Sequence, residues 1–293
     1  MDIRILTCEA KFMPTIREIQ LFELQMLKDI AKVCDENKIT YLLASGTLLG
    51  AARHGGFIPW DDDIDLYMPL KDYKRFLKIG QKCLGDKYFV QNYKTDKNYG
   101  EMWTQIRANG TTSMPKSCYK YNIHFGMCLD IFPMVGASSN EKKREKQDKA
   151  LEFNRVLLHD SYAKAVGENI SPKLKLLYLI PRGIRRFICK LNEHRYLIDP
   201  NKTESWKSVW FSLNVPMYQH ELLNNYDKIK FEDDYFNTFK NYDLYLTDLY
   251  GEYMTPPPIE ERGGHTDELG EIIFDLHKDY SEYQRQLFND NNS

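Results

Sequence analysis

The stretch SGTLLGAARHGGFIPWDDDIDLYM, residues 45–68, places negative charge inside what otherwise reads as a buried segment. Apolar residues stand on both sides of a group of four aspartates: Asp61, Asp62, Asp63 and Asp65. A solvated loop or a set of helix caps would explain the first two. It would not explain Asp65, which alternates with Ile64 and Leu66 as in a half-buried strand. The pattern therefore indicates a functional reason for the charge.

The spacing of Asp63 and Asp65 predicts a paired carboxylate site. We expect a strand over DIDLYM, residues 63–68, and a strand places residues two apart on the same face. Neighbouring carboxylates repel, so one of them resists ionisation unless a cation lies between them. Hard oxygen ligands of this kind suit Mg²⁺ or Mn²⁺. Asp61 and Asp62, which precede the strand, would add a ligand or a contact to one.

A Gly-Thr pair lies upstream of the acids, between a predicted strand over 40–44 and a predicted short helix over 47–53. Gly46 would let the backbone approach a phosphate. The amides of Thr47 and Leu48 would open the helix, where anions are favoured. A strand, a Gly-Thr pair, a short helix and a strand with Asp-x-Asp together describe a nucleotidyltransferase-type palm.

Such a palm needs a third carboxylate from a neighbouring strand. The segment CLDIFPM, residues 128–134, offers Asp130 as its only acid. We expect Asp130 to bind the metal or to accept a proton from an attacking hydroxyl as a general base. The predicted catalytic residues are therefore Asp63, Asp65 and Asp130.

The rest of the chain predicts an α/β (α+β) fold with a nucleotidyltransferase-like mixed sheet and a helical C-terminal portion. Thr15 and Glu18 fit a capping box at the start of the first helix. Apolar periodicity predicts helices over 15–39, 70–84 and 138–160, and strands over 87–93, 101–108 and 125–134. We expect a catalytic core over 1–137 and a mainly helical region over 138–293 that packs on it.

Composition narrows the class of protein. The net charge of the 293 residues is -2, which argues against nucleic acid as a partner. The N-terminus lacks the apolar run of a signal peptide, and no run is long enough to span a bilayer. The six cysteines show no zinc-ligand spacing, so we expect reduced thiols and a cytoplasmic location.

The quoted stretch also resembles the signature of the LicD family of phosphotransferases, whose animal relatives are fukutin and fukutin-related protein. The segments QIRANGTT, GMCLDIFPM and YGEYMTPPP resemble later blocks of that family, in the same order. The resemblance extends from about residue 16 to residue 265. It implies a nucleotidyltransferase-like fold, with metal ligands at Asp63 and Asp65, the first acid at Asp61, and Asp130 in the Asp-Ile-Phe-Pro block.

The resemblance also implies a reaction. Members move a substituted phosphate from a cytidine diphosphate donor to a sugar hydroxyl and release CMP. The leading hypothesis is metal-dependent transfer of phosphocholine from CDP-choline to a cell-surface glycan precursor of the teichoic acid or lipopolysaccharide type. One alternative is a nucleotidyltransferase that acts on a small-molecule acceptor. Another is a non-catalytic protein that binds a nucleotide.

Further site candidates are weaker, because each has an ordinary structural explanation. Arg53 follows the short helix and Arg107 ends a strand, so either could contact phosphate oxygens, although Arg53 reads equally well as a surface arginine. His265 stands in a Gly-flanked loop and is a candidate on the strength of the resemblance. Choline needs an aromatic face, and Trp60 and Trp103 are the candidates, although aromatic residues are more often core.

The segment 173–191 carries six basic residues and no acid. After Pro181, apolar residues would share one helical face and the arginines the other. Such a helix either packs its apolar face on the core with solvated basic residues outside, or lies on an anionic membrane surface. The second reading would suit a lipid-linked acceptor and a peripheral position on the inner face of the cytoplasmic membrane.

Overall fold

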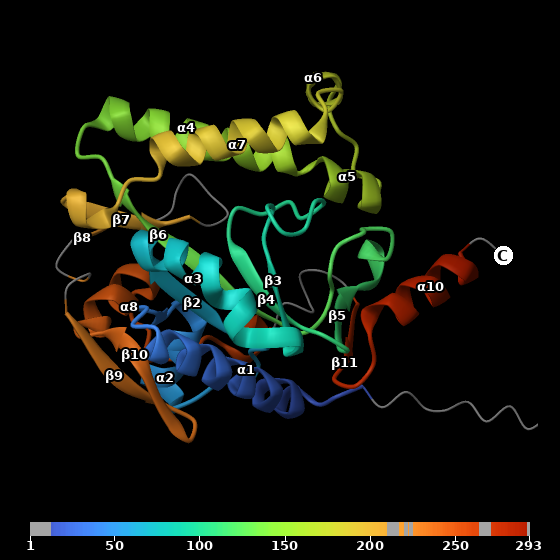
Figure 1. Ribbon diagram of the computed structural model, residues 1–293. Helices are drawn as coiled ribbons and strands as arrows, with labels where there is room; N and C mark the ends of the chain where they lie inside the picture. The colour runs from blue at the N-terminus through green and yellow to red at the C-terminus, as the bar shows by residue number, and fades with distance from the viewer. Residues whose placement is uncertain (1–12, 210–216, 220–221, 223–224, 264–270, 292–293) are drawn as a thin grey trace, which may run out of the picture.

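The computed structural model describes residues 13–209, 217–219, 222, 225–263 and 271–291. A mixed sheet in the order β1-β2-β6-β4-β3 forms its centre, and β7 and β8 extend it along β6 (Figure 1). β2 and β6 run parallel, whereas the other neighbours in this sheet are antiparallel. The strands are β1 (Leu42–Leu43), β2 (Asp65–Pro69), β3 (Tyr88–Gln91), β4 (Thr104–Ala108), β6 (Cys128–Ala137), β7 (Ser205–Ser208) and β8 (Tyr218–Gln219). The predicted α/β class and the expected strands of the core are confirmed.

Three helices of the N-terminal half pack with this sheet: α1 (Ile16–Glu36), α2 (Ser45–His54) and α3 (Leu70–Leu84). The capping box at α1 is present, because the Thr15 side chain bonds the Glu18 amide and Glu18 bonds back to the Thr15 amide. Apolar side chains spaced three and four apart on α1 and α3 are buried against the strands, which is why both helices form as predicted.

A second helical layer covers the molecule beyond the sheet (Figure 1). It consists of α4 (Glu141–Leu158), α5 (Asp160–Val166), α6 (Pro172–Leu177) and α7 (Arg182–Tyr196). α4 and α7 pack side by side through polar contacts: Asn154 Nδ2 donates to the Cys189 carbonyl at 3.3 Å, and Asn192 Nδ2 donates to Asn154 Oδ1 at 2.7 Å. This layer is the charged helical region expected from residue 138.

Strands also occur in the C-terminal half, so the region after residue 137 is not helical alone. β9 pairs with β10, and β11 pairs with β5. The bounds are β5 (Thr112–Pro115), β9 (Tyr226–Phe231), β10 (Asp234–Phe239), α8 (Tyr242–Tyr250), β11 (Ile272–Asp275) and α10 (Tyr280–Asp290), with short 3-10 turns at Gly85–Lys87, Lys116–Cys118, Pro200–Lys202 and Ile259–Glu261. Since β7 and β8 continue the central sheet, the predicted boundary at 137 divides one sheet. The division into a core over 1–137 and a region over 138–293 that packs on it stays a prediction.

The structure contradicts the reading of segment 173–191 in which the basic residues are solvated and the apolar face packs on the core. The reading in which it lies on a membrane surface stays a prediction. Arg185 is 2% exposed, and Arg182 and Arg185 both form ion pairs with Asp160. The expectation of solvated arginines is therefore wrong for these two, because Asp160 draws them inward. Ile184, Phe187 and Leu191 of α7 face outward instead, each more than half exposed. Among the helices of the described ranges, none combines the length and apolar character needed to cross a bilayer.

Candidate active site

A cavity of about 310 Å³ lies against the central sheet, and carboxylates form one end of it. Asp65 and Asp130 stand opposite each other in the parallel register of β2 and β6. Both side chains line the cavity, together with Asp62 and Asp63. The sequence-predicted acids thus come together, although β6 follows β2 by more than sixty residues. The volume is at the small end of the range for small-molecule sites.

Local hydrogen bonds hold the two strand acids in place. The Asp65 amide donates to Thr47 Oγ1 at 2.8 Å, which ties α2 to the start of β2. The Asp130 amide donates to the Ile64 carbonyl at 2.9 Å. Trp103 Nε1 donates to Asp130 Oδ2 at 3.1 Å and so orients that carboxylate.

Asp63 reaches the cavity by a different route from the one predicted. β2 begins at Asp65, so Asp63 belongs to the preceding loop and strand alternation does not set its direction. Ile64 is fully buried, as expected. Asp61 lies beside the start of α2, where a Cβ on residue 46 would stand 3.0 Å from its Oδ2 atom. Gly46 therefore permits the close approach of this carboxylate.

Glu23 is an acid of the site that the sequence patterns did not identify. It lies on α1, is 2% exposed and lines the cavity. Its Oε2 atom is buried, and no hydrogen-bond partner for it is found among the described residues. One turn earlier on α1, Gln20 Nε2 donates to the carbonyls of Ile58 and Asp61 and so holds the acidic loop against the helix. A glutamate within an amphipathic helix carries no sequence signal that separates it from a solvated one.

The electrostatics of the acid end follow from burial and like charge. Burial raises the pKa of Asp65 well above its usual range, and Asp63, Asp130 and Asp61 raise it further. Burial raises the pKa of Glu23 in the same way, with the charges of the neighbouring aspartates adding to the effect. The described residues hold no group of three or more His, Cys, Asp or Glu side chains already in metal-binding geometry. The chemistry of the acids, with a buried carboxylate oxygen awaiting a partner, still fits a hard divalent cation.

The start of α2 corrects one predicted phosphate contact. The helix begins at Ser45, two residues earlier than expected, with Ser45 at a left-handed φ of 42°. The Leu48 amide therefore donates to the Ala44 carbonyl at 3.0 Å as the first bond of the helix. It is engaged within the helix, which removes it as a phosphate donor. The Thr47 amide precedes that bond, and phosphate binding at Gly46 and Thr47 stays a prediction.

A buried cation, Arg107, stands in another part of the cavity wall. It is 6% exposed and donates to Gln91 Oε1 at 2.9 Å, to the Gly126 carbonyl at 2.8 Å and to Gln105 Oε1 at 2.5 Å. Its partners are all neutral oxygens, and no ion pair of Arg107 is found in the described part of the chain. Its positive charge faces a cavity that could hold an anion, and phosphate binding by Arg107 stays a prediction.

Aromatic side chains line the space between these charges. Trp103 lies in this wall and is tilted against Phe132 at 5.4 Å between ring centroids, and Tyr121 contacts Tyr162 edge to face at 5.7 Å. The Tyr99 hydroxyl is buried in the wall without a hydrogen-bond partner in the described ranges. The aromatic cavity residues are Tyr99, Trp103, Tyr121, Phe125, Phe132, Tyr162 and Phe274.

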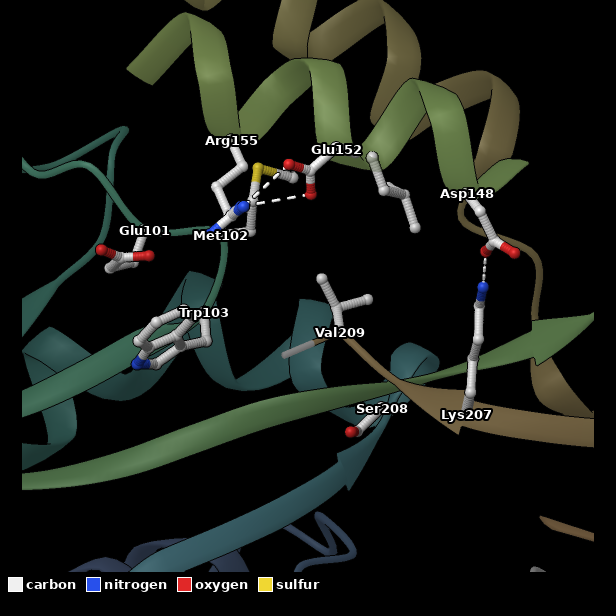
Figure 2. Close-up of a pocket in the computed structure, with 10 residues that line it drawn as sticks. Glu101, Met102, Trp103, Asp148, Glu152, Arg155, Lys207, Ser208 and Val209 are labelled. Atoms are coloured by element: carbon white, nitrogen blue, oxygen red, sulfur yellow. Dashed lines mark hydrogen bonds and ion pairs between the residues drawn. The ribbon is translucent and has the colours of Figure 1, made fainter. Parts of the chain in front are cut away.

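Glu101 lies between this cavity and a smaller one of about 30 Å³ beneath α4, and it lines both, as does Trp103 (Figure 2). Arg155 extends from α4 to the same region and pairs with Glu152 at 2.7 Å (Figure 2). Nearer the start of α4, Asp148 pairs with Lys207 of β7 (Figure 2). Burial raises the pKa of Glu101 to about 7, although Arg155 opposes the shift. This second acid of the site was also absent from the predicted set.

Trp60 does not belong to the cavity lining that contains Trp103. The Arg262 guanidinium lies 4.8 Å from the centre of its ring, and His54 contacts it edge to face at 6.3 Å. Arg53 donates to the Tyr253 carbonyl at 2.9 Å and to His54 Nε2 at 3.0 Å. The candidate choline residue Trp60 is thus already covered by a cation, and Arg53 has protein partners. His265 lies outside the described residues.

Comparisons with known proteins point in one direction. Residues 38–161 match a family model described as LicD/FKTN/FKRP, nucleotidyltransferase domain. The lipopolysaccharide cholinephosphotransferase LicD of Haemophilus influenzae is 30% identical over 263 residues, which cover 86% of this chain and 96% of that protein. The ribitol 5-phosphate transferase FKRP of Homo sapiens is 45% identical over 53 residues, which cover 17% of this chain and 11% of FKRP.

Proposed function

The chain belongs to the LicD/FKTN/FKRP family, and from this premise and the cavity we propose that it is a phosphotransferase that acts on a glycan. The group transferred is phosphocholine, with CDP-choline as donor and CMP as the second product. The observation that carries this proposal is the pairing of Asp65 with Asp130 on the wall of a cavity that also holds aromatic side chains and Glu101.

The acid end suits the diphosphate of the donor. Mg²⁺ or Mn²⁺, held by Asp63 and Asp65 with Asp130 and Glu23 nearby, would neutralise charge on the diphosphate when bound. The Thr47 hydroxyl positions Asp65 by accepting a hydrogen bond from the Asp65 amide, and Trp103 positions the Asp130 carboxylate. Arg107 supplies the positive charge that the chain itself contributes to the cavity.

The chemical step is an in-line displacement. The oxygen of a sugar hydroxyl forms a bond to the phosphorus that carries choline, and the bond from that phosphorus to the CMP oxygen breaks. CMP leaves with the electron pair. Asp130 accepts the hydroxyl proton when it acts as the base. When Asp130 is a metal ligand instead, the proton passes to water.

The aromatic wall and Glu101 would hold the choline group. A quaternary ammonium cannot donate hydrogen bonds, so it is recognised by aromatic faces and by negative charge. Trp103 and Tyr99 flank Glu101 in the sequence, and all three line the cavity. Burial and the charge of Asp130 raise the pKa of Glu101, which is half-buried. The positive charge of bound choline would lower that pKa and favour the ionised form of Glu101.

A donor screen tests the proposal. The purified protein is incubated with Mg²⁺, a glycan precursor of the lipopolysaccharide or teichoic acid type, and CDP-choline, CDP-ethanolamine, CDP-ribitol or CDP-glycerol. CMP release that is fastest with CDP-choline supports it, whereas preference for another donor excludes choline as the transferred alcohol. Release of pyrophosphate from a nucleoside triphosphate would indicate a nucleotidyltransferase instead. Binding of donor without any release would indicate a non-catalytic protein that binds a nucleotide.

A further inference from the structure

Exposed apolar side chains concentrate at one edge of the helical layer. They lie in α6, in the turn after it and in α7, and each is at least half exposed: Leu176, Leu179, Ile184, Phe187 and Leu191. Residues 184, 187 and 191 are spaced three and four apart and so lie on one face of α7. We call these five residues the apolar strip. α7 and α4 lie at the edge of the molecule away from α1 (Figure 1).

The rotation of α7 that exposes the strip is set by buried contacts. Arg185 Nη2 pairs with Asp160 Oδ2 at 2.7 Å, and its Nη1 donates to the Leu157 carbonyl at 2.5 Å. Cys189, one turn further on, is fully buried against Asn154. If α7 were rotated so that its exposed apolar residues faced the core, Arg185 would lose its contacts with Asp160 and the Leu157 carbonyl. The exposed stripe is therefore a fixed property of the fold.

The charge around the strip indicates what covers it. Residues 171–192 contain no acid, and Lys173, Lys175 and Lys190 are exposed among the apolar residues. The first acid beyond them, Glu193, pairs with Lys94 at 2.7 Å. Lysine is depleted at interfaces between proteins, whereas lysine beside exposed apolar residues is the composition of helices that lie on anionic membranes. The composition favours a lipid surface over a protein partner.

We propose that the apolar strip docks this protein on an anionic phospholipid surface, with the strip in the headgroup region and the three lysines against lipid phosphates. Arg182 and Arg185 take no part, because they are bound to Asp160. α5 leads into α6, and its Tyr162 lines the cavity. Docking through α6 and α7 would therefore hold the cavity close to the membrane, within reach of an acceptor carried on a lipid.

Vesicle cosedimentation in EDTA tests the docking without reference to catalysis. The vesicles contain phosphatidylglycerol and phosphatidylcholine in equal parts, and pure phosphatidylcholine vesicles serve as the uncharged comparison. Leu191→Ser should weaken binding to the anionic vesicles roughly tenfold, since a leucine leaves the interface. Leu21→Ser is the matched control, because Leu21 on α1 is 49% exposed and Leu191 is 53% exposed. It should leave binding unchanged.

The charge arm uses Lys173→Gln, Lys175→Gln and Lys190→Gln together, which should weaken binding about a hundredfold at low salt. Added salt should reproduce that loss. The proposal is overturned if the wild-type protein fails to bind anionic vesicles at low salt, or if Leu191→Ser and Leu21→Ser bind alike. It is also overturned if the wild type forms dimers that Leu191→Ser abolishes, because the strip would then be a protein interface. CMP release from a soluble acceptor is read separately, so failure of the docking and failure of the proposed chemistry are distinguishable.

Discussion

Asp65 and Asp160 are buried to nearly the same extent, with 6% and 4% of their surface exposed, yet their surroundings are opposite. Asp160 lies between two arginines, and Arg185 in particular is as buried as its partner. Asp65 faces other carboxylates. Burial raises the pKa of both, but Arg185 and Arg182 outweigh burial at Asp160 and lower its pKa overall. At Asp65 the neighbouring acids add to burial.

This difference distinguishes a buried charge that stabilises the fold, at Asp160, from a buried charge whose proposed partner is a ligand, at Asp65. A buried ion pair whose members satisfy each other holds two helices in one arrangement. Buried like charges destabilise the fold in the absence of a cation, so their retention needs another explanation. In this protein that explanation is the proposed metal and donor site.

The largest expected effect is a loss of activity without a loss of stability when an acid of the cavity is replaced. Asp65→Asn and Asp130→Asn should each reduce CMP release on the order of a thousandfold or more, because the loss of a metal contact removes several kcal/mol of charge stabilisation. Thermal unfolding in EDTA should show both variants at least as stable as the wild type, since each change relieves like-charge repulsion. Near-normal turnover at saturating Mg²⁺ in either variant would remove that residue from the site.

The matching change at the structural pair should act on stability. Asp160→Asn leaves Arg185 buried without a charged partner, so the free energy of unfolding should fall by about 3–5 kcal/mol. Denaturant unfolding at neutral pH measures this, and the folded fraction should retain turnover. The pKa of Asp160 is lowered, so its contribution is present at neutral pH and is lost as the pH falls below 3.8. A variant as stable as the wild type would show that the pair is dispensable.

Glu101 lies between these two cases, because Arg155 lowers its pKa but burial still raises that pKa overall. We expect the affinity for CDP-choline to increase as the pH rises through about 7, where Glu101 ionises. Glu101→Gln should remove this dependence and weaken binding above that pH roughly tenfold. Calorimetry on either side of that pH tests both points, with CDP-glycerol as the control because its alcohol is uncharged. Equal pH dependence for the two donors would separate Glu101 from choline recognition.

The smallest expected effect concerns Glu23 in metal-free protein. Its pKa is raised in the folded state, so its stabilising contribution is present below about 4.5 and is lost as the pH rises. Glu23→Gln should therefore raise the melting temperature modestly in EDTA at neutral pH and have no such effect in acid. Mn²⁺ titration by calorimetry provides the second measurement, in which the variant should bind the ion more weakly. If the wild type and the variant melt alike at every pH, Glu23 is not part of the acid end.

Several features were predictable because they depend on neighbouring residues. The capping box of α1, the apolar face of α3 and the acids on β2 and β6 all lie where local spacing placed them. The prediction for Leu48 was wrong, because α2 begins two residues earlier and engages that amide. Glu23 and Glu101 were not recognisable, since nothing close to them in the sequence separates a buried acid from a solvated one.

The sequence by itself determined which residues share a face of each helix or strand, because that follows from the regular geometry of the backbone. It also predicted that Asp63, Asp65 and Asp130 lie together, and all three line one cavity. Only the tertiary structure decided which face of α7 is buried. In α7 the choice depends on Asp160, twenty-five residues away from Arg185, and it turns the arginines inward and the apolar strip outward. The free energy of such a contact depends on the distance between groups from separate helices, which local spacing does not specify.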